Sequence, residues 1–218
     1  MKSLRVALVV LAFNAIPALA ADHVFNLTGW AAWVDPNSTN TFNSSAPNQP
    51  LNVSFNGKLG YGAGVNIFFG SHFSTAFDAV QVRPDATVRS RAVGGGSFAT
   101  TGSRMTTLSG VLQWHFAPDG VVDPYVGAGA AYVVFDKTNV FGSTLRQINF
   151  KDDAGLAVNA GVSFRLSRML ALTADGKYVP LKSSATAVYL PEAGIVAPPA
   201  LNVKINPVIF SGGLTLRF

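Results

Sequence analysis

The sequence contains no cysteine, and only 12% of its residues are charged. Without cysteine the fold has no disulfide framework, so an exported chain must draw its stability from the fold alone. Beyond the first twenty residues, no uninterrupted apolar run reaches the roughly 20 residues that a membrane-spanning helix needs. No run of lysine and arginine forms a basic patch, and this argues against nucleic-acid binding.

Apolar residues are abundant instead. They make up 49% of the chain, and the mean hydropathy is +0.31. A chain this apolar without spanning helices fits a closed β-barrel, because only helices and closed barrels satisfy every backbone polar group in lipid. The length suits one domain.

The first twenty residues have the composition of a secretory signal peptide. Lys2 and Arg5 form a basic start, residues 6–16 are apolar, and Ala18-Leu19-Ala20 is a cleavage site. We therefore expect a signal peptide at 1–20 and one barrel domain at 21–218. The alternative is a retained N-terminal anchor, which the shortness of the apolar core disfavours.

The last sixteen residues, Val203 to Phe218, show the clearest period of two. Phe210, Leu214, Leu216 and Phe218 share one side of a strand, opposite small, polar or charged residues. A final strand that ends on phenylalanine is similar to the closing strand of bacterial outer-membrane barrels. In those proteins the terminal aromatic is an assembly signal, so these four residues are expected to engage the barrel-assembly machinery.

Seven further segments alternate in the same way, with short turns and long polar connections between them. This pattern predicts an all-β fold, an eight-stranded antiparallel transmembrane β-barrel of up-and-down topology, with both termini and the short turns in the periplasm. The predicted strands are 24–34, 55–69, 72–82, 103–116, 123–135, 153–166, 169–179 and 203–218. The predicted extracellular loops are 35–54, 83–102, 136–152 and 180–202, with a short helical piece at 145–150.

Aromatic residues near strand ends or on lipid-facing sides are expected to form interfacial girdles, with ordinary barrel packing as the alternative. They are Trp30, Trp33, Tyr61, Trp114, Tyr132 and Tyr178.

Charged residues fall on the inward faces of the predicted strands, since a lysine or arginine facing lipid costs about 2–4 kcal/mol near the midplane. We expect Asp78 to pair with Lys58 or with another cation across strands. The favoured interpretation is a structural network that plugs the lower barrel; the alternative is a gate that selects permeants. The predicted lumen residues are Lys58, Asp78, His115, Arg165, Asp175, Lys177 and Arg217.

Glycines on inward faces allow two interpretations. They leave room for a thin apolar molecule, or they let a small barrel close around bulky neighbours, which is the favoured reading. They are Gly60, Gly62, Gly64, Gly127 and Gly129.

Catalytic and metal-binding patterns are not recognisable. His23, His72 and His115 show neither triad spacing nor a metal-ligand pattern, so we expect no catalytic residue, metal or cofactor. The segment 94–96 is glycine-rich but is not followed by the Lys-Ser/Thr of a phosphate-binding loop. A lipid-modifying barrel enzyme is the least favoured alternative, and would need a histidine-centred polar cluster at the outer rim.

Several blocks resemble the OmpW family of outer-membrane proteins, in order and over nearly the whole chain after residue 20. They are Pro124-Tyr125-Val126-Gly127-Ala128-Gly129, Gln113-Trp114-His115-Phe116, Ala160 to Phe164, Asp175-Gly176-Lys177-Tyr178, and Asn206-Pro207 through Leu216-Arg217-Phe218. The resemblance implies an outer-membrane barrel with a narrow, largely apolar channel for small hydrophobic molecules. Some members have an aromatic that narrows the channel where this chain has Lys177, which argues against a dry apolar gate at that height.

The favoured function is passive passage of small hydrophobic molecules, with capture by apolar loop residues, a block at the charged lumen and lateral exit into lipid. The expected partners are outer-membrane lipid and a small hydrophobic permeant. The alternative is a structural barrel whose surface loops bind a partner without transport. The predicted capture residues are Phe42, Phe98, Phe141 and Leu190.

Overall fold

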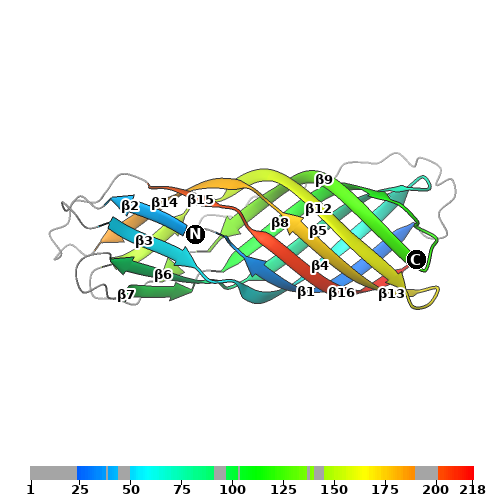
Figure 1. The fold of residues 1–218 in the computed structure, drawn as a ribbon, viewed down its shortest axis with the longest axis horizontal. Coiled ribbons are helices and arrows are strands. Elements are labelled where there is room, and N and C mark those ends of the chain that lie inside the picture. Colours follow the sequence, from blue (N-terminus) through cyan, green and yellow to red (C-terminus); the bar gives the residue numbers. More distant parts are fainter. Residues whose placement is uncertain are drawn as a thin grey trace, which may run out of the picture.

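Eight strands close into an antiparallel barrel in the computed structural model, which describes residues 24–37, 39–43, 50–90, 97–102, 104–136, 138–139, 145–189 and 201–218. Around the ring the order is β1-β16-β13-β12-β9-β8-β5-β4, so the first and last barrel strands are neighbours (Figure 1). The barrel strands are β1 (Phe25–Asp35), β4 (Lys58–Phe69), β5 (Phe73–Val82), β8 (Met105–His115), β9 (Val122–Phe135), β12 (Asp153–Arg165), β13 (Leu170–Tyr178) and β16 (Val208–Arg217).

The barrel confirms the fold class predicted from the alternation of side chains, and seven of the eight predicted strands match within three residues. The exception is the closing strand, which was predicted as one piece from residue 203. It is interrupted at Asn206 and Pro207, because proline has no N–H to donate to a ladder. No helix in the described ranges is long and apolar enough to cross a membrane.

The described parts of the long connections form β-strands, which their polar composition did not predict. They contain two four-stranded sheets, β2-β3-β6-β7 and β10-β11-β14-β15, which continue beyond one end of the barrel and are called the extension sheets below (Figure 1). The predicted helical piece at 145–150 is wrong, since it is strand β11 and pairs with β14. The bounds are β2 (Thr39–Asn43), β3 (Pro50–Phe55), β6 (Asp85–Ser90), β7 (Ser97–Gly102), β10 (Thr138–Asn139), β11 (Leu145–Phe150), β14 (Leu181–Tyr189) and β15 (Leu201–Ile205).

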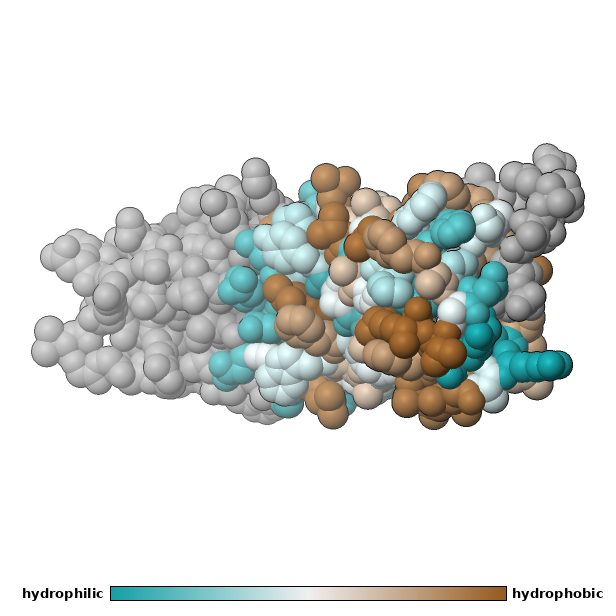
Figure 2. Space-filling view, turned by 45° about the vertical axis from the view of Figure 1, so that its right-hand side comes forward, coloured by the Kyte–Doolittle hydropathy of each residue, from teal (hydrophilic) through white to brown (hydrophobic). Residues whose placement is uncertain are grey.

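Large apolar side chains cover the outside of the barrel, as in proteins that face lipid. Leu59, Tyr61 and Leu156 are 67%, 68% and 73% exposed, although each belongs to a regular strand. Figure 2 shows apolar side chains over the barrel surface, with hydrophilic ones gathered mainly toward its two ends. The strand faces predicted from sequence therefore have the correct orientation.

Exposed aromatics lie toward both ends of the barrel wall. Trp33, Tyr61, Tyr132 and Tyr178 belong to the strand ends nearest the two extension sheets. Trp114 lies at the opposite end, where its ring meets Phe73 edge-on at 4.6 Å and stacks on His72 at 5.2 Å. These positions agree with interfacial girdles.

Trp30 was predicted as a girdle residue, and this was wrong. It points into the barrel and lines the internal cavity, because it alternates with the outward Ala31 on β1. Its partners across the two neighbouring strands are Gly62 on β4 and Gly213 on β16. A Cβ atom at Gly213 would lie 2.7 Å from the Trp30 ring, so the indole occupies space left by glycine.

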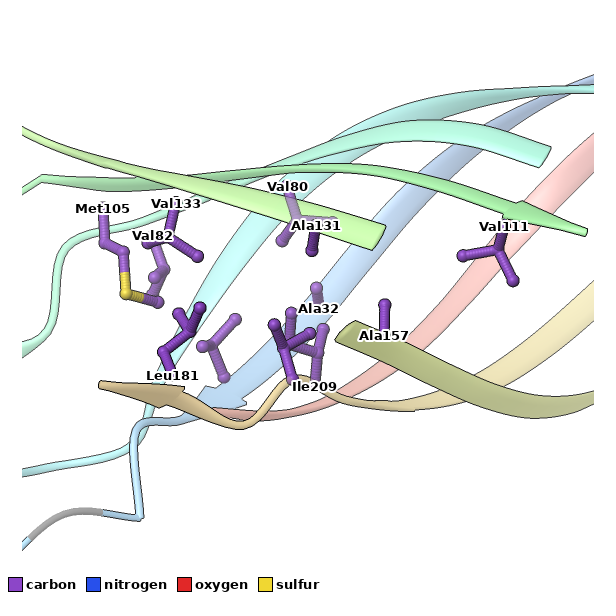
Figure 3. Packing of buried hydrophobic residues seen from close by; sticks show 12 residues of the cluster. Ala32, Val80, Val82, Met105, Val111, Ala131, Val133, Ala157, Leu181 and Ile209 are labelled. Carbon is purple, nitrogen blue, oxygen red and sulfur yellow. The ribbon is translucent and has the colours of Figure 1, made fainter. Parts of the chain in front are cut away.

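The barrel interior is divided into an apolar layer and a polar layer. The apolar layer lies toward the extension sheets and packs aliphatic side chains that are almost completely buried. Figure 3 shows Met105, Val82 and Val133 on one wall facing Leu181 and Ile209 on the other. Pro36 and Pro207 are also fully buried near this end. In barrels of this type the end with long connections is extracellular, so the apolar layer forms the outer half of the lumen.

Candidate functional site

The candidate site is the polar half of the lumen, between the apolar layer and the short-turn end. It contains a cavity of about 60 Å³ lined by residues from all eight barrel strands. Pockets that hold drug-sized ligands are about 300–1,000 Å³, so this cavity accommodates only water or a small ion. The lower barrel is therefore filled by its own side chains rather than open as a pore.

Lys177 forms an ion pair across this cavity. Its Nζ donates to Asp78 at 2.6 Å from Oδ1 and 2.5 Å from Oδ2, and to Ser109 Oγ at 2.7 Å. The Lys177 side chain is 5% exposed and that of Asp78 is 10% exposed. Burying charges is costly unless they are paired, and here each charge has its counterion. The expected pairing of Asp78 with a cation is confirmed, and the cation is Lys177.

Asp175 lies on the same face of β13 as Lys177, as predicted, but has different partners. One carboxylate oxygen, Oδ2, accepts hydrogen bonds from Tyr125 Oη at 3.0 Å and from Asn159 Nδ2 at 2.8 Å. Tyr125 crosses over Gly161, where any side chain would overlap its phenol ring. Three strands, β9, β12 and β13, are thus joined at one carboxylate.

His115 belongs to a buried chain of hydrogen bonds that the sequence did not reveal. Its Nε2 lies 2.9 Å from Ser74 Oγ and its Nδ1 lies 2.6 Å from Asp123 Oδ2. Asp123 is in turn fixed by the backbone N–H of Ala117 at 3.2 Å. The order serine, histidine, aspartate matches the connectivity of a catalytic triad.

Substrate access to this chain of hydrogen bonds is lacking. Ser74 is fully buried and does not line the cavity, and the His115 ring is packed between Phe68 at 4.7 Å and Tyr125 at 5.1 Å. It also lies at the short-turn end, not at the outer rim. Because a nucleophile must be reachable by its substrate, the geometry describes a structural network.

Arg217 links two sides of the barrel at the short-turn end of the lumen. It is 7% exposed, and its guanidinium donates to the carbonyl oxygen of Pro118 at 3.1 Å. Pro118 belongs to the turn between β8 and β9, while Arg217 ends β16 on a distant part of the ring. This contact holds the turn against the cavity, which Pro118 and Gly120 help to line.

The structure brings together six of the seven predicted lumen residues as cavity-lining side chains, all except Lys58. Lys58 begins β4 at the outer end, and its side chain is exposed. Sequence reasoning did not identify the neutral members of the network, which are Ser74, Ser109, Tyr125 and Asn159. The only signal for them in the sequence is the alternation along each strand, which places them on inward faces.

The inward glycines of β4 and β9 do not leave a passage. A Cβ atom at Gly60 would overlap the carbonyl oxygen of Gln81, and one at Gly129 would overlap that of Gly110. These positions therefore need glycine because neighbouring backbone approaches closely, which agrees with the closure interpretation.

The predicted capture residues cannot be placed as a group. Phe141 and Leu190 lie outside the described residues, and Phe42 and Phe98 lie in β2 and β7, of which only the backbone is described. Within the described part of the chain, no three His, Asp or Glu side chains are grouped to hold a metal ion.

A closed barrel with an apolar exterior, aromatic ends and a charged interior defines a bacterial outer-membrane β-barrel. Comparison with solved structures agrees. The structure of OprG from Pseudomonas aeruginosa matches with a TM-score of 0.72 at 16% identity, covering 90% of this chain and 96% of that one. The AlkL structure in lipid bilayers gives 0.54 at 22% identity, covering 94% and 96%, and E. coli outer membrane protein W gives 0.51 at 18%, covering 90% and 98%.

The OmpW family model matches residues 25–218, and the chain belongs to this family of the outer membrane. Outer membrane protein AlkL of Ectopseudomonas oleovorans is 30% identical over 108 residues, which are 49% of this chain and 44% of AlkL. The outer-membrane protein y4mB of Sinorhizobium fredii is 25% identical over 107 residues, again 49% and 44%. The chain thus matches less than half the length of either relative. Families and folds of this kind are generally non-enzymatic.

Proposed function

We propose that this protein passes small hydrophobic molecules across the outer membrane without a cofactor or energy coupling. The observation that carries the proposal is the division of the lumen into an apolar outer half and a charged, filled inner half. Entry into the apolar outer half lowers the free energy of an apolar molecule by about 25 cal/mol per Å² of surface removed from water. The molecule meets a barrier at the charged inner half, where Lys177 and Asp78 would have to separate.

Entry into the outer half requires side chains to move, because Val34, Val133 and Val179 are fully buried there. All three side chains are aliphatic, so an entering apolar molecule replaces their apolar contacts with one another by apolar contacts to itself. Loop residues Phe42, Phe98, Phe141 and Leu190 are proposed to capture the molecule first. Since side chains fill the inner half, exit is proposed to be lateral, through the wall into lipid.

Uptake by outer-membrane-limited cells tests the proposal, with an apolar probe compared with a polar probe of similar size. The protein should accelerate entry of the apolar probe alone. Val133→Thr adds a hydroxyl inside the apolar layer without changing size, and should slow apolar uptake. Val134→Thr on the outward face of the same strand is the matched control and should leave uptake unchanged. Equal entry of both probes with and without the protein would overturn the proposal.

A second candidate function is a structural barrel whose outer connections bind a partner. It is favoured by the two sheets that continue beyond one end of the barrel and by the filled lower lumen. It predicts that probe uptake is the same with and without the protein. It also predicts that deleting residues 44–49 and 91–96 from the outer connections abolishes capture of the partner. Apolar uptake that requires the protein would reject it.

A further inference from the structure

A row of hydroxyl groups crosses four neighbouring strands near the short-turn end of the lumen. Thr28 Oγ1 on β1 lies 2.9 Å from Thr215 Oγ1 on β16, and Thr215 lies 2.7 Å from Thr173 Oγ1 on β13. Thr173 donates to Ser163 Oγ on β12 at 3.3 Å. The four strands are consecutive in the ring, so the row follows the inner wall.

The direction of this row is fixed by counting hydrogens, because each hydroxyl has only one to donate. Since Thr173 donates to Ser163, Thr215 must donate to Thr173, and Thr28 to Thr215. Aligned O–H dipoles polarise one another, and the positive end of the row lies at Ser163. The hydrogen of Ser163 itself has no acceptor among the described residues.

Arg165 lies two residues after Ser163 on the same inward face of β12 and lines the same cavity. Its guanidinium, alone among the cations that line the cavity, makes no hydrogen bond or ion pair with the described part of the chain. A half-buried guanidinium has five N–H donors to satisfy. The unused hydroxyl of Ser163 and the unused guanidinium of Arg165 therefore belong to the same inward face of β12 and line the same cavity. Arg217 lies two residues after Thr215 on β16, which is two strands away from β12 in the ring.

The carboxylates that share the cavity do not supply the missing acceptor. Asp78 is bound to Lys177, Asp123 to His115, and Asp175 to Tyr125 and Asn159. The lining carries three aspartates against one lysine and two arginines, so the formal charges cancel when His115 is neutral. Any attraction for an anion is therefore local to Arg165 and Ser163.

We propose that Ser163 and Arg165 bind a phosphate group at the periplasmic mouth of the barrel. A guanidinium presents two parallel N–H donors that match two oxygens of a tetrahedral oxyanion, and the Ser163 hydroxyl supplies a third donor. The cavity of about 60 Å³ has room for such a group. The phosphate comes either from the free ion or from a phospholipid headgroup, since Arg165 ends its strand beside the exposed turn at 166–169.

The test uses the full-length mature protein folded in maltoside micelles, which contain no phosphate. Inorganic phosphate is titrated at constant ionic strength, with chloride as the replacement ion, and NMR signals of the Ser163 and Thr173 amides and the Arg165 Nε–H are followed. A second arm titrates lyso-phosphatidylglycerol. We expect saturable shifts at these three groups in at least one arm, and the arm that responds identifies the source of the phosphate.

Arg165→Gln should weaken the binding about tenfold or more, because charge-assisted hydrogen bonds are lost. Arg168→Gln makes the same charge change on the exposed turn, away from the cavity, and should leave binding unchanged. Should Arg165→Gln fail to fold, Arg165→Lys keeps the charge but removes the paired donors, and should also weaken binding. Shifts that fail to saturate in both arms, or equal binding by the folded Arg165 variant and wild type, would overturn the proposal.

Discussion

Lys177 and Asp78 join opposite walls of the barrel. They belong to β13 and β5, which lie four places apart in a ring of eight strands, and the ammonium lies within 2.6 Å of both carboxylate oxygens. Ser109, on the strand next to β5, shares the ammonium. One lysine therefore spans the lumen, and the stability of the barrel and its permeability to polar solutes should both depend on it.

Breaking this pair should be more harmful than removing it entirely. Lys177→Met leaves the Asp78 carboxylate buried without a counterion and should lower the free energy of unfolding by about 3–5 kcal/mol. Combining it with Asp78→Asn should recover most of that loss. Urea unfolding in lipid vesicles measures the coupling, with Arg168→Met on the exposed turn as a control that changes little. Additive single-variant effects would show that the two residues are not coupled.

Shortening the charged side chains should open the lower lumen to polar solutes. Lys177→Ala or Asp175→Ala removes atoms that fill the cavity, and should increase entry of a small polar probe into liposomes that contain the protein. Apolar probe entry should change less, because the apolar layer is untouched. Unchanged permeation of both probes in both variants would remove these two residues as a barrier.

Two adjacent glycines should respond differently to alanine. A Cβ atom at Gly213 would lie 2.7 Å from the Trp30 ring and overlap the backbone of Gly29, whereas a Cβ atom at Gly212 meets nothing within 4 Å. Gly213→Ala should destabilise the barrel by about 1–3 kcal/mol, as overpacking does. Gly212→Ala should be neutral or slightly stabilising. Urea midpoints provide the comparison, and equal midpoints would contradict the close packing at Gly213.

Ser74 should be chemically unreactive despite its triad-like partners. Because its side chain is fully buried, a fluorophosphonate probe should not label the folded protein, whereas a serine hydrolase treated in parallel should be labelled. Labelling that disappears in Ser74→Ala would show that the site is reached by small molecules and would reopen the question of catalysis.

The sequence predicted the barrel well because a lipid-facing strand requires an alternation that is visible in the chain. Phe25, Leu27 and Trp33 are exposed as that alternation requires, and the inward charges of β13 meet partners inside. The extension sheets were missed because hydrogen bonding between polar hairpins leaves little trace in hydropathy. β11 is an example, since its strand character depends on pairing with β14 rather than on its own pattern.

The candidate site was predicted only in part, because strand parity gives direction but not partners. Parity places Lys177 and Asp78 inside, yet their meeting depends on which strands lie opposite each other in the closed ring. The same limit explains the hydrogen-bond chain at His115. Asp123 and Ser74 come from different strands, and no spacing in the sequence relates them to the histidine.

Trp30 has a consequence for how the barrel selects its strand register. On β4, a slip of two residues would still place it opposite glycine, at Gly60 or Gly64. On β16, the same slip would place it opposite Ser211 or Thr215, where a side chain occupies the space that Gly213 leaves empty. The Trp30 indole therefore fits only one of these three registers on β16, the one that places it opposite Gly213. No connecting turn fixes the seam between β1 and β16, so this fit adds to the backbone ladder and the Thr28–Thr215 hydrogen bond in aligning the two ends of the barrel.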